Sequence, residues 1–294
     1  NMTTYPANFD VTDSAAAATA MATGRKVYNN VISEAIPGNG RDLKTVLEYM
    51  KGLGKRTGLV STAYITHATP AAFAAHTGSR NNLDTIGNDY LFGSRPNLLF
   101  GGGGNGAHGL SAAETEAAGY HTVTTKIDFA ALVPESFEFY SAQFGTDHMP
   151  YMYDDPATYP QLSDMTAKAL ALLENGPNGF FLMVEGGRID HAEHDHDLAR
   201  MVSELLEFED AISTALAWRA GHPDAVIIVT ADHETGGVAV RRNNGVGVLP
   251  SVDWTAPSHT NADVPVFASG TDRDILFGQF DNTYIHDLVT DFFE

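Results

Sequence analysis

A serine at the start of a helix of small residues is the first residue whose position in this chain could do chemistry. Ser14 follows Asp13 and precedes the run AAAATAMATG, which predicts a helix that ends near Gly24. The first turn of a helix offers free backbone amides and a positive dipole end, which favour an oxyanion. Taken alone, Asp13 and Ser14 would be interpreted as helix caps. A nucleophilic serine needs a base or a metal, and no Ser-His-Asp arrangement is evident, so a metal is the better candidate.

The segment VEGGRIDHAEH carries carboxylates and imidazoles at the spacing of a metal site. A predicted strand delivers Glu185 at its carboxyl end, two glycines turn the chain, and Asp190 and His194 follow in a helix. Positions i and i+4 share one face of a helix, so these two side chains can converge on one ion. The acidic and histidine-rich continuation is interpreted as a solvated helix face. Asp-x-x-x-His with an upstream Glu therefore predicts metal ligation.

Two later segments offer further ligands. Asp232 and His233, in TADHETGG, end the strongest predicted strand, and the two glycines indicate that the chain has already turned, so both could bind one ion. In isolation, ligation and turn capping explain this pair equally well. His259, in APSHTNADVPVFASG, gains weight because a zinc ion held by Asp190 and His194 needs a third protein ligand while keeping an open position.

The segment THATPAAFAAHTGSR contains candidates for phosphate binding. His67 and Thr69 follow a predicted strand, and Arg80 lies past the helix that comes next. A surface role is the ordinary interpretation of an arginine, but only 17 residues of this chain are Lys or Arg. The planar guanidinium could bind two phosphate oxygens at once. His76 is interpreted as structural.

These clusters lie where predicted strands end or helices begin, which is where open α/β sheets bind their ligands. Short apolar runs alternate with amphipathic segments, which predicts an α/β fold with a mostly parallel central sheet and helices on both faces. The predicted elements are strands at 57–63, 179–184, 225–230 and 264–268, and helices at 43–53, 162–173, 203–218 and 281–293.

Residues 83–160 look less regular and are interpreted as an inserted or peripheral excursion from the main sheet. Their glycine run, GGGGNG, lacks the lysine of a phosphate-binding P-loop and predicts a tight turn after a strand that ends at Phe100. No linker separates this segment from the rest. We therefore expect one catalytic domain over 1–294.

Composition bounds the classes of function. The 294 residues are 43% hydrophobic, which suits a sizeable buried core, and no apolar run approaches the about 20 residues of a membrane helix. With no cysteine, any metal must be held by His, Asp, Glu or hydroxyl groups.

Charge separates the classes of ligand. A net charge of −20 argues against nucleic-acid binding, which depends on Lys and Arg. It indicates a solubilising acidic surface or adaptation to high salt. An anionic substrate would then need a local positive centre, which bound cations can provide.

Together the clusters resemble the alkaline phosphatase family. The resemblance runs from VTDSAAAATAMATG to HTNADVPVFASG and covers essentially the whole chain. In that family the serine of the DSA motif attacks phosphorus, and metal-bound water hydrolyses the resulting phosphoserine. The resemblance implies hydrolysis of phosphate monoesters with Ser14 as the nucleophile, Arg80 as the phosphate clamp and Asp13 orienting Arg80.

The resemblance also implies two zinc ions and one magnesium ion. The implied ligands are Asp190, His194 and His259 for the first zinc, Asp232 and His233 for the second, and Glu185 and Thr69 for magnesium. The second zinc would activate Ser14. His67 and His191 occupy positions that vary within the family, in a pattern closer to the animal enzymes than to the enteric bacterial ones. They would contact phosphate or its waters indirectly.

One family residue has no counterpart. The family has an aspartate upstream of the serine that bridges the second zinc and magnesium, but only thirteen residues precede Ser14. We therefore expect that the sequence is truncated at its N-terminus and lacks a central strand. The resemblance further implies a bacterial protein, periplasmic or secreted, that forms a homodimer.

Two alternatives remain open. One is another enzyme of the same superfamily, such as a phosphodiesterase, sulfatase or phosphoglycerate mutase. A sulfatase needs a modified Cys or Ser in C/S-x-P-x-R, which DSAAA does not match, and a diester hydrolase has less use for Arg80. The other is a non-catalytic metal-binding protein that keeps the fold without the chemistry.

Overall fold

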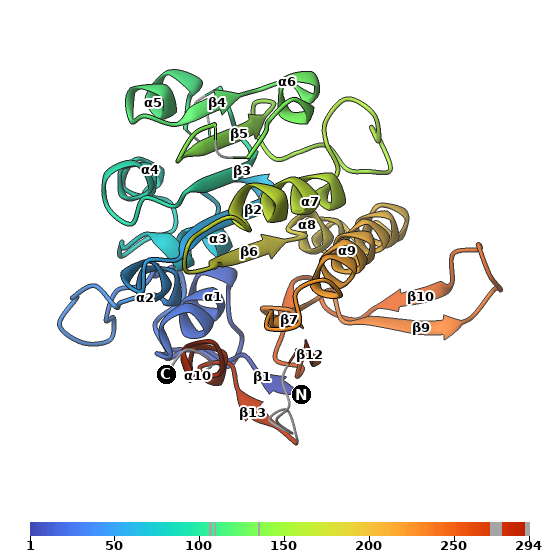
Figure 1. Cartoon of the computed structure of the whole chain (residues 1–294). Coiled ribbons are helices and arrows are strands. Elements are labelled where there is room, and N and C mark those ends of the chain that lie inside the picture. Colours follow the sequence, from blue (N-terminus) through green and yellow to red (C-terminus); the bar gives the residue numbers. More distant parts are fainter. Residues whose placement is uncertain (106–107, 109, 135, 271–277, 292–294) are drawn as a thin grey trace.

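The structure is a computed structural model that describes residues 1–105, 108, 110–134, 136–270 and 278–291. Its central strands are β2 (Arg56–Tyr64), β3 (Leu98–Gly102), β4 (His121–Val123), β5 (Tyr140–Phe144) and β6 (Phe180–Glu185). They form a five-stranded, wholly parallel sheet in the order β4-β5-β3-β2-β6 (Figure 1). The predicted α/β class with a mostly parallel central sheet is confirmed.

Helices cover both faces of this sheet. They are α1 (Ser14–Thr23), α2 (Val46–Gly52), α3 (Ala68–Ala74), α4 (Leu83–Phe92), α5 (Ala112–Ala117), α6 (Lys126–Ala130), α7 (Leu162–Leu173), α8 (Arg188–His194), α9 (Leu198–Arg219) and α10 (Tyr284–Asp291). Successive residues of a strand point to opposite faces. Leu59 of β2 therefore packs in a core with α1 to α4, whereas its neighbour Val60 packs in a second core with α7 and α9.

The segment 83–160 differs from the expected irregular excursion. It supplies three of the five central strands, and β3 lies between β2 and β5. The strand continues through Gly101 and Gly102 instead of ending at Phe100. A Cβ at Gly102 would lie 2.3 Å from the backbone oxygen of Asp147, so the glycines allow a neighbouring loop to approach the strand closely.

The remaining strands form separate two-stranded pairs. They are β1 (Met2–Thr3) with β13 (Phe280–Asp281), β7 (Ile227–Thr230) with β12 (Val266–Ser269), β8 (Glu234–Thr235) with β11 (His259–Thr260), and β9 (Val238–Arg242) with β10 (Ser251–Trp254). β7, which matches the strand predicted at 225–230, is half-buried and pairs with β12 in antiparallel fashion, outside the five-stranded sheet. β9 and β10 form an arm that projects from the body (Figure 1).

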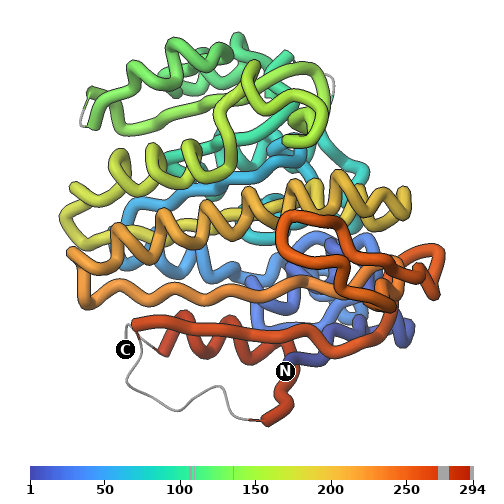
Figure 2. The backbone as a smooth tube through the Cα atoms, turned by 90° about the vertical axis from the view of Figure 1, so that its right-hand side faces the viewer, coloured from blue at the N-terminus to red at the C-terminus, as the bar shows by residue number. Residues whose placement is uncertain are grey.

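The ends of the described chain lie at one side of the molecule (Figure 2). β1 and β13 join them through parallel pairing of Met2 with Phe280. No helix among the described residues combines the length and the apolar character needed to cross a membrane.

Capping residues explain where the helices begin. α1 starts at Ser14 after the N-cap Asp13 and ends before Gly24, which adopts a φ of 68°, as expected. α2 starts three residues later than expected because Thr45 and Glu48 form a capping box. The closing helix starts at residue 284 instead of 281, and the end expected for it at 293 lies outside the described residues.

Candidate active site

β2 and β6 lie side by side (Figure 1), and several candidate residues follow the carboxyl ends of these two strands. The chain leaves β2 for the segment of His67 and Thr69, and β6 ends on Glu185 before α8, which carries Asp190. Ser14 begins α1 and lies beside residues from the far end of the chain. The site therefore occupies the carboxyl edge of the sheet, as the sequence predicted.

Ser14 contacts a histidine that an aspartate also contacts. Asp13 accepts the backbone N–H of Ala16 and places Ser14 at the first helical position. Ser14 Oγ lies 3.1 Å from His233 Nε2, and Asp232 Oδ2 lies 3.1 Å from the same nitrogen. In a Ser-His-Asp triad the serine and the aspartate contact different nitrogens of the ring. In this chain Ser14 Oγ, Asp232 Oδ2 and His233 Nε2 instead lie together, as three ligand atoms around a cation would.

Thr235 orients the ring of His233. Its hydroxyl donates to Asp190 Oδ1 at 2.6 Å, so it accepts from His233 Nδ1 at 3.3 Å. A proton on Nδ1 leaves the Nε2 lone pair facing the Asp232 carboxylate, an arrangement that favours a second proton or a cation. Burial would lower the pKa of His233, but the charge of Asp232, the hydrogen bond to Asp232 and the charges of Asp190 and Asp13 together outweigh it and raise the pKa.

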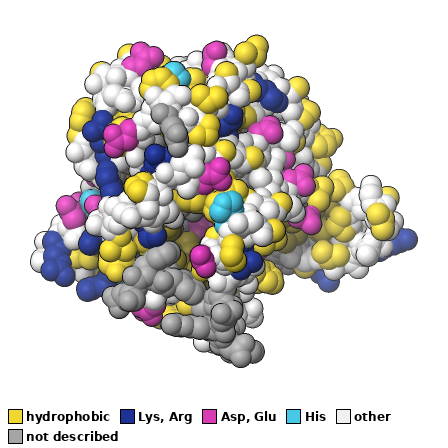
Figure 3. Space-filling view, in the orientation of Figure 1, with side chains coloured by type: hydrophobic (Ala, Val, Ile, Leu, Met, Phe, Trp, Pro, Cys, Tyr) yellow, Lys and Arg dark blue, Asp and Glu magenta, His cyan; other side chains and the backbone are white. Residues whose placement is uncertain are grey.

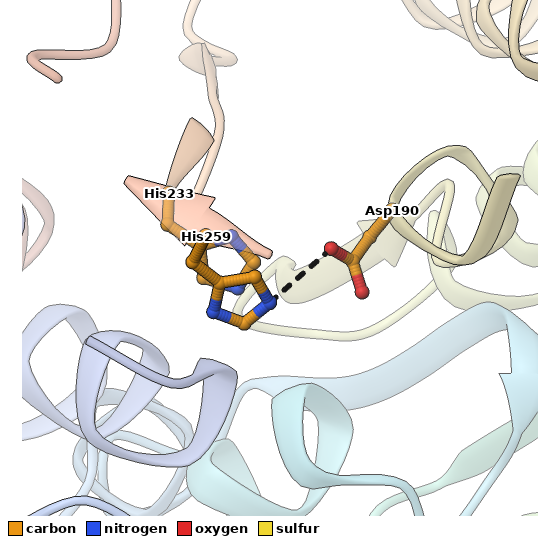
Figure 4. A group of neighbouring side chains, drawn as sticks. All are labelled: Asp190, His233 and His259. Atoms are coloured by element: carbon orange, nitrogen blue, oxygen red, sulfur yellow. Dashed lines mark ion pairs between the residues drawn. The ribbon is translucent and has the colours of Figure 1, made fainter. Parts of the chain in front are cut away.

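A second group of ligand atoms lies next to the first. His194 Nε2 and His259 Nε2 are 2.9 Å apart, and Asp190 Oδ1 lies 3.4 Å from each. His259 Nδ1 donates to the carbonyl oxygen of Thr12 at 2.8 Å, so its Nε2 lone pair can bind a metal. Ligand atoms of Asp190, His233 and His259 all lie within 4.8 Å of one another and point to a common space (Figure 4).

Asp190 stays ionised inside this group. Burial would raise its pKa, but the contact with His259, the charge of His233 and the hydroxyl of Thr235 together hold the pKa well below its usual range. A carboxylate beside two imidazoles is a ligand set that suits zinc with one position left open. The residues present therefore fit a zinc ion.

Glu185 completes the acidic part of the site. It pairs with Ser61 across β2 and β6, and Ser61 Oγ donates to its carboxylate, as does the hydroxyl of Thr69. Burial raises the pKa of Glu185 to about 7, against these hydrogen bonds, and the charges of Asp232 and Asp190 add to the rise. Carboxylate and hydroxyl oxygens suit Mg²⁺, which would relieve this repulsion.

Arg80 lies between Asp13 and His67. Its Nη1 donates to Asp13 Oδ2 at 3.2 Å, and its Nη2 donates to His67 Nε2 at 3.1 Å. Asn30 places both ends of this pair, because its N–H donates to Asp13 Oδ2 and its carbonyl accepts the N–H of Arg80. The same aspartate thus caps α1 and orients the guanidinium.

Three histidines that pack together beside Arg80, through His67, are kept neutral. His67 accepts at Nε2, and its buried Nδ1 has no hydrogen-bond partner within the described part of the chain. Burial and then the charge of Arg80 hold the pKa of His67 well below its usual range. Burial and Arg188 lower the pKa of His191 to about 4, and burial and His191 lower that of His148 to about 3. Neutral imidazoles can ligate a metal or donate an N–H to an anion.

Three residues of the site were not singled out from the sequence. His148 packs 4.3 Å from the ring of His191, and Thr235 and Ser61 hold the carboxylates of Asp190 and Glu185. His148 follows β5 within a few residues, so the expectation that ligands bind where strands end could have identified it. Ser61 was visible as a polar residue in an apolar strand, whereas nothing local distinguished Thr235.

Comparisons with known proteins point to one family. The family model described as alkaline phosphatase matches residues 1–103 and 87–252. Alkaline phosphatase 4 of Bacillus subtilis strain 168 is 40% identical over 252 residues, covering 82% of this chain and 54% of that protein. Alkaline phosphatase 3 of the same organism is 33% identical over 364 residues, covering 96% and 78%. The chain thus spans about half the length of the first of these relatives.

Solved structures of alkaline phosphatases share the fold of this chain. A cold-active alkaline phosphatase from a psychrophilic Shewanella species superposes with a TM-score of 0.89 at 30% identity, covering 100% of this chain and 89% of that one. Alkaline phosphatase from the Antarctic bacterium TAB5 gives a TM-score of 0.87 at 30% identity, with 99% and 86% covered. A variant of the TAB5 protein with one histidine changed to aspartate is described with magnesium in its M3 site.

Proposed function

Since the chain belongs to the alkaline phosphatase family, we propose that it hydrolyses phosphate monoesters with Ser14 as the nucleophile. The contact of Ser14 and Asp232 with one nitrogen of His233 carries this proposal. It offers the serine a cation site in place of a histidine base.

Ser14 and Arg80 divide the work on the substrate. The guanidinium binds two oxygens of the phosphate, and the free amides at the start of α1 face the negative charge. A bond forms between Ser14 Oγ and phosphorus while the bond from phosphorus to the alcohol oxygen breaks. The proton of Ser14 passes to solvent, and the alcohol oxygen takes up a proton from water as it leaves. Water then cleaves the phosphoserine, which releases phosphate and restores the serine hydroxyl.

We propose two zinc ions and one magnesium ion as cofactors. Their ligands are Asp190, His194 and His259 for the first zinc, Asp232 and His233 for the second, and Glu185 and Thr69 for magnesium. Bound ions of this kind stabilise the charge on the entering and leaving oxygens of an in-line displacement. His67 and His191 would contact phosphate or its waters indirectly, since both are neutral, His67 contacts Arg80 and His191 packs against His67.

Acid trapping of the intermediate tests the nucleophile. Metal-loaded protein is incubated with radiolabelled phosphate, quenched in acid and digested, and the label is expected on the peptide that contains Ser14. Ser14→Ala should abolish the label and lower turnover by roughly 10³-fold or more. Ser111→Ala, which removes a capping hydroxyl of α5, is the matched control and should keep both. Unlabelled wild-type protein, or unchanged turnover in Ser14→Ala, would refute the mechanism.

Oligomeric state, localisation and the class of ligand also follow from the family resemblance and the charge of the chain. We propose a homodimer that is periplasmic or secreted and does not bind nucleic acid. Acidic and basic side chains alternate with apolar ones over the described face in Figure 3. The net charge of −20 disfavours a polyanionic ligand, whereas a small phosphate ester can reach the cations of the site.

A further inference from the structure

His76 lies just after α3, away from the candidate metal ligands, and both nitrogens of its ring face acceptors. Nδ1 lies 2.9 Å from the carbonyl oxygen of Ser33, and Nε2 lies 3.1 Å from Glu48 Oε1. A carbonyl oxygen can only accept, and the Glu48 carboxylate already accepts the N–H of Thr45. His76 therefore donates from both nitrogens and is an imidazolium. Its side chain is only 13% exposed, so water replaces neither partner.

The charges around this ring favour the protonated form. The charged groups that face it from α2, α4 and the loop before α2 are Glu34, Asp42, Lys44, Glu48 and Asp89. Burial would lower the pKa of His76, but the hydrogen bonds to Glu48 and Ser33 and the charges of Glu48 and Asp42 together outweigh it and raise the pKa to about 9. The imidazolium joins α2, α3 and the loop that contains Ser33.

That loop leads directly to the phosphate-binding arginine. Thr77 exchanges two backbone hydrogen bonds of 2.9 Å with Ile32. Asn30, two residues earlier, accepts the N–H of Arg80 at 2.7 Å and donates its own N–H to Asp13 Oδ2 at 3.1 Å. Asn30 has a φ of 73°, a left-handed conformation that must be held by its surroundings. The position of Arg80 thus depends on the loop that His76 ties down.

We propose that the His76 imidazolium is a positioning residue for Arg80, acting through Ser33, the Ile32–Thr77 pair and Asn30. The inference rests on the proposed hydrolysis of phosphate monoesters. Loss of the imidazolium releases the Ser33 carbonyl and lets Asn30 move relative to Asp13. Because the guanidinium holds phosphate in both the bound substrate and the transition state, the change appears in KM more than in kcat.

Steady-state kinetics of the metal-loaded full chain with p-nitrophenyl phosphate tests this role. His76→Gln removes the positive charge and one donor, and Glu48→Gln removes the charged partner. Both should raise KM roughly 10-fold near pH 7.5, with kcat within about 3-fold of wild type. The matched control is His222→Gln. It removes a histidine that follows α9 and lies near Glu174, and it should change neither KM nor kcat.

The pH profile separates positioning from general loosening. Wild-type His76 loses its proton as the pH rises through about 9. The ratio of the KM of His76→Gln to that of wild type should therefore fall toward one by about pH 10.5. A ratio that does not change with pH, or a KM for His76→Gln equal to that of His222→Gln, would overturn the inference.

Amide hydrogen exchange distinguishes failure of the positioning role of His76 from failure of the proposed hydrolysis. If the metal-loaded wild type does not hydrolyse the ester, the proposed function is wrong, and exchange then decides the positioning role. The amides of Asn30 and Arg80 should exchange at least about 10-fold faster in His76→Gln than in His222→Gln, because their protection requires the held loop. Equal exchange in the two variants would overturn the role of His76 whatever the turnover.

Discussion

Replacing Glu185 with glutamine should stabilise the metal-free protein at alkaline pH. Burial raises the pKa of this carboxyl from an ordinary 4.5 to about 7, although Ser61 and Thr69 donate hydrogen bonds to it. Below about pH 4.5 the group is protonated in the folded and unfolded chains alike. Between about 4.5 and 7 the unfolded chain ionises first, so stability falls as the pH rises, and the full penalty is present above about pH 7.

The size of the effect follows from the same pKa values. Each pKa unit corresponds to about 1.4 kcal/mol, so ionised Glu185 destabilises the metal-free fold by about 3 kcal/mol above pH 7. The amide of Glu185→Gln can still accept from Ser61, but it buries an NH₂ group at a cost of about 1 kcal/mol. The variant should thus be about 2 kcal/mol more stable than wild type near pH 8.5, and within about 1 kcal/mol of it near pH 5.

Urea unfolding of chelator-treated protein at the two pH values measures this difference. Added Mg²⁺ should stabilise the wild type more than Glu185→Gln at pH 8.5, because a bound cation removes the penalty of the buried charge. Exposed Glu209 provides the control, since Glu209→Gln should not change the unfolding midpoint at either pH. A metal-free Glu185→Gln protein that is less stable than wild type at pH 8.5 would refute the argument that the carboxylate is held at a cost.

Three further substitutions test other parts of the molecule. Arg80→Ala should raise KM for a phosphate monoester roughly 10- to 100-fold, because it removes charge-assisted hydrogen bonds, and should spare a diester; a diester preference that ignores Arg80 would contradict the proposed function. His259→Ala should lose one equivalent of zinc by elemental analysis while His196→Ala keeps it, and equal contents would exclude the ligand set. Gly102→Ala should destabilise the fold by about 1–3 kcal/mol in urea, because its Cβ would meet a backbone oxygen at 2.3 Å; an unchanged midpoint would show that the loop yields.

Local chemistry predicted much of the framework. The N-cap Asp13 and the glycine after α1 marked that helix, and the expectation that ligands lie at the carboxyl ends of strands placed Glu185 at the end of β6. The predicted end of β3 was wrong, because Gly101 and Gly102 are residues typical of a turn. Here they lie within the strand, where the absence of side chains lets a neighbouring loop approach. A glycine can serve a turn or the close approach of another segment, and only the tertiary contacts show which of the two applies.

The electrostatic state of the site could not be read from residue types. The sequence suggested that His233 and Asp232 share an ion, but the contact of Ser14 with the same nitrogen joins residues more than 200 positions apart. The pKa values of Glu185 and Asp190 move in opposite directions because one is buried with few donors and the other has histidines around it. The contacts of His76 could not be predicted for the same reason, since its acceptors come from segments distant in the sequence.

The burial of α1 has a consequence for how this protein can evolve or be engineered. All ten of its residues are buried, so the helix presents no solvent-facing side on which substitutions could accumulate. A larger residue at its alanine positions would press against α3, α10 or, at Ala16, the side chains of Val27 and Val31, and would displace the serine at its first position. Random libraries should therefore tolerate little more than Ala, Gly or Ser at the alanine positions of this stretch. Variation in substrate preference would have to be sought in the loops that surround the helix.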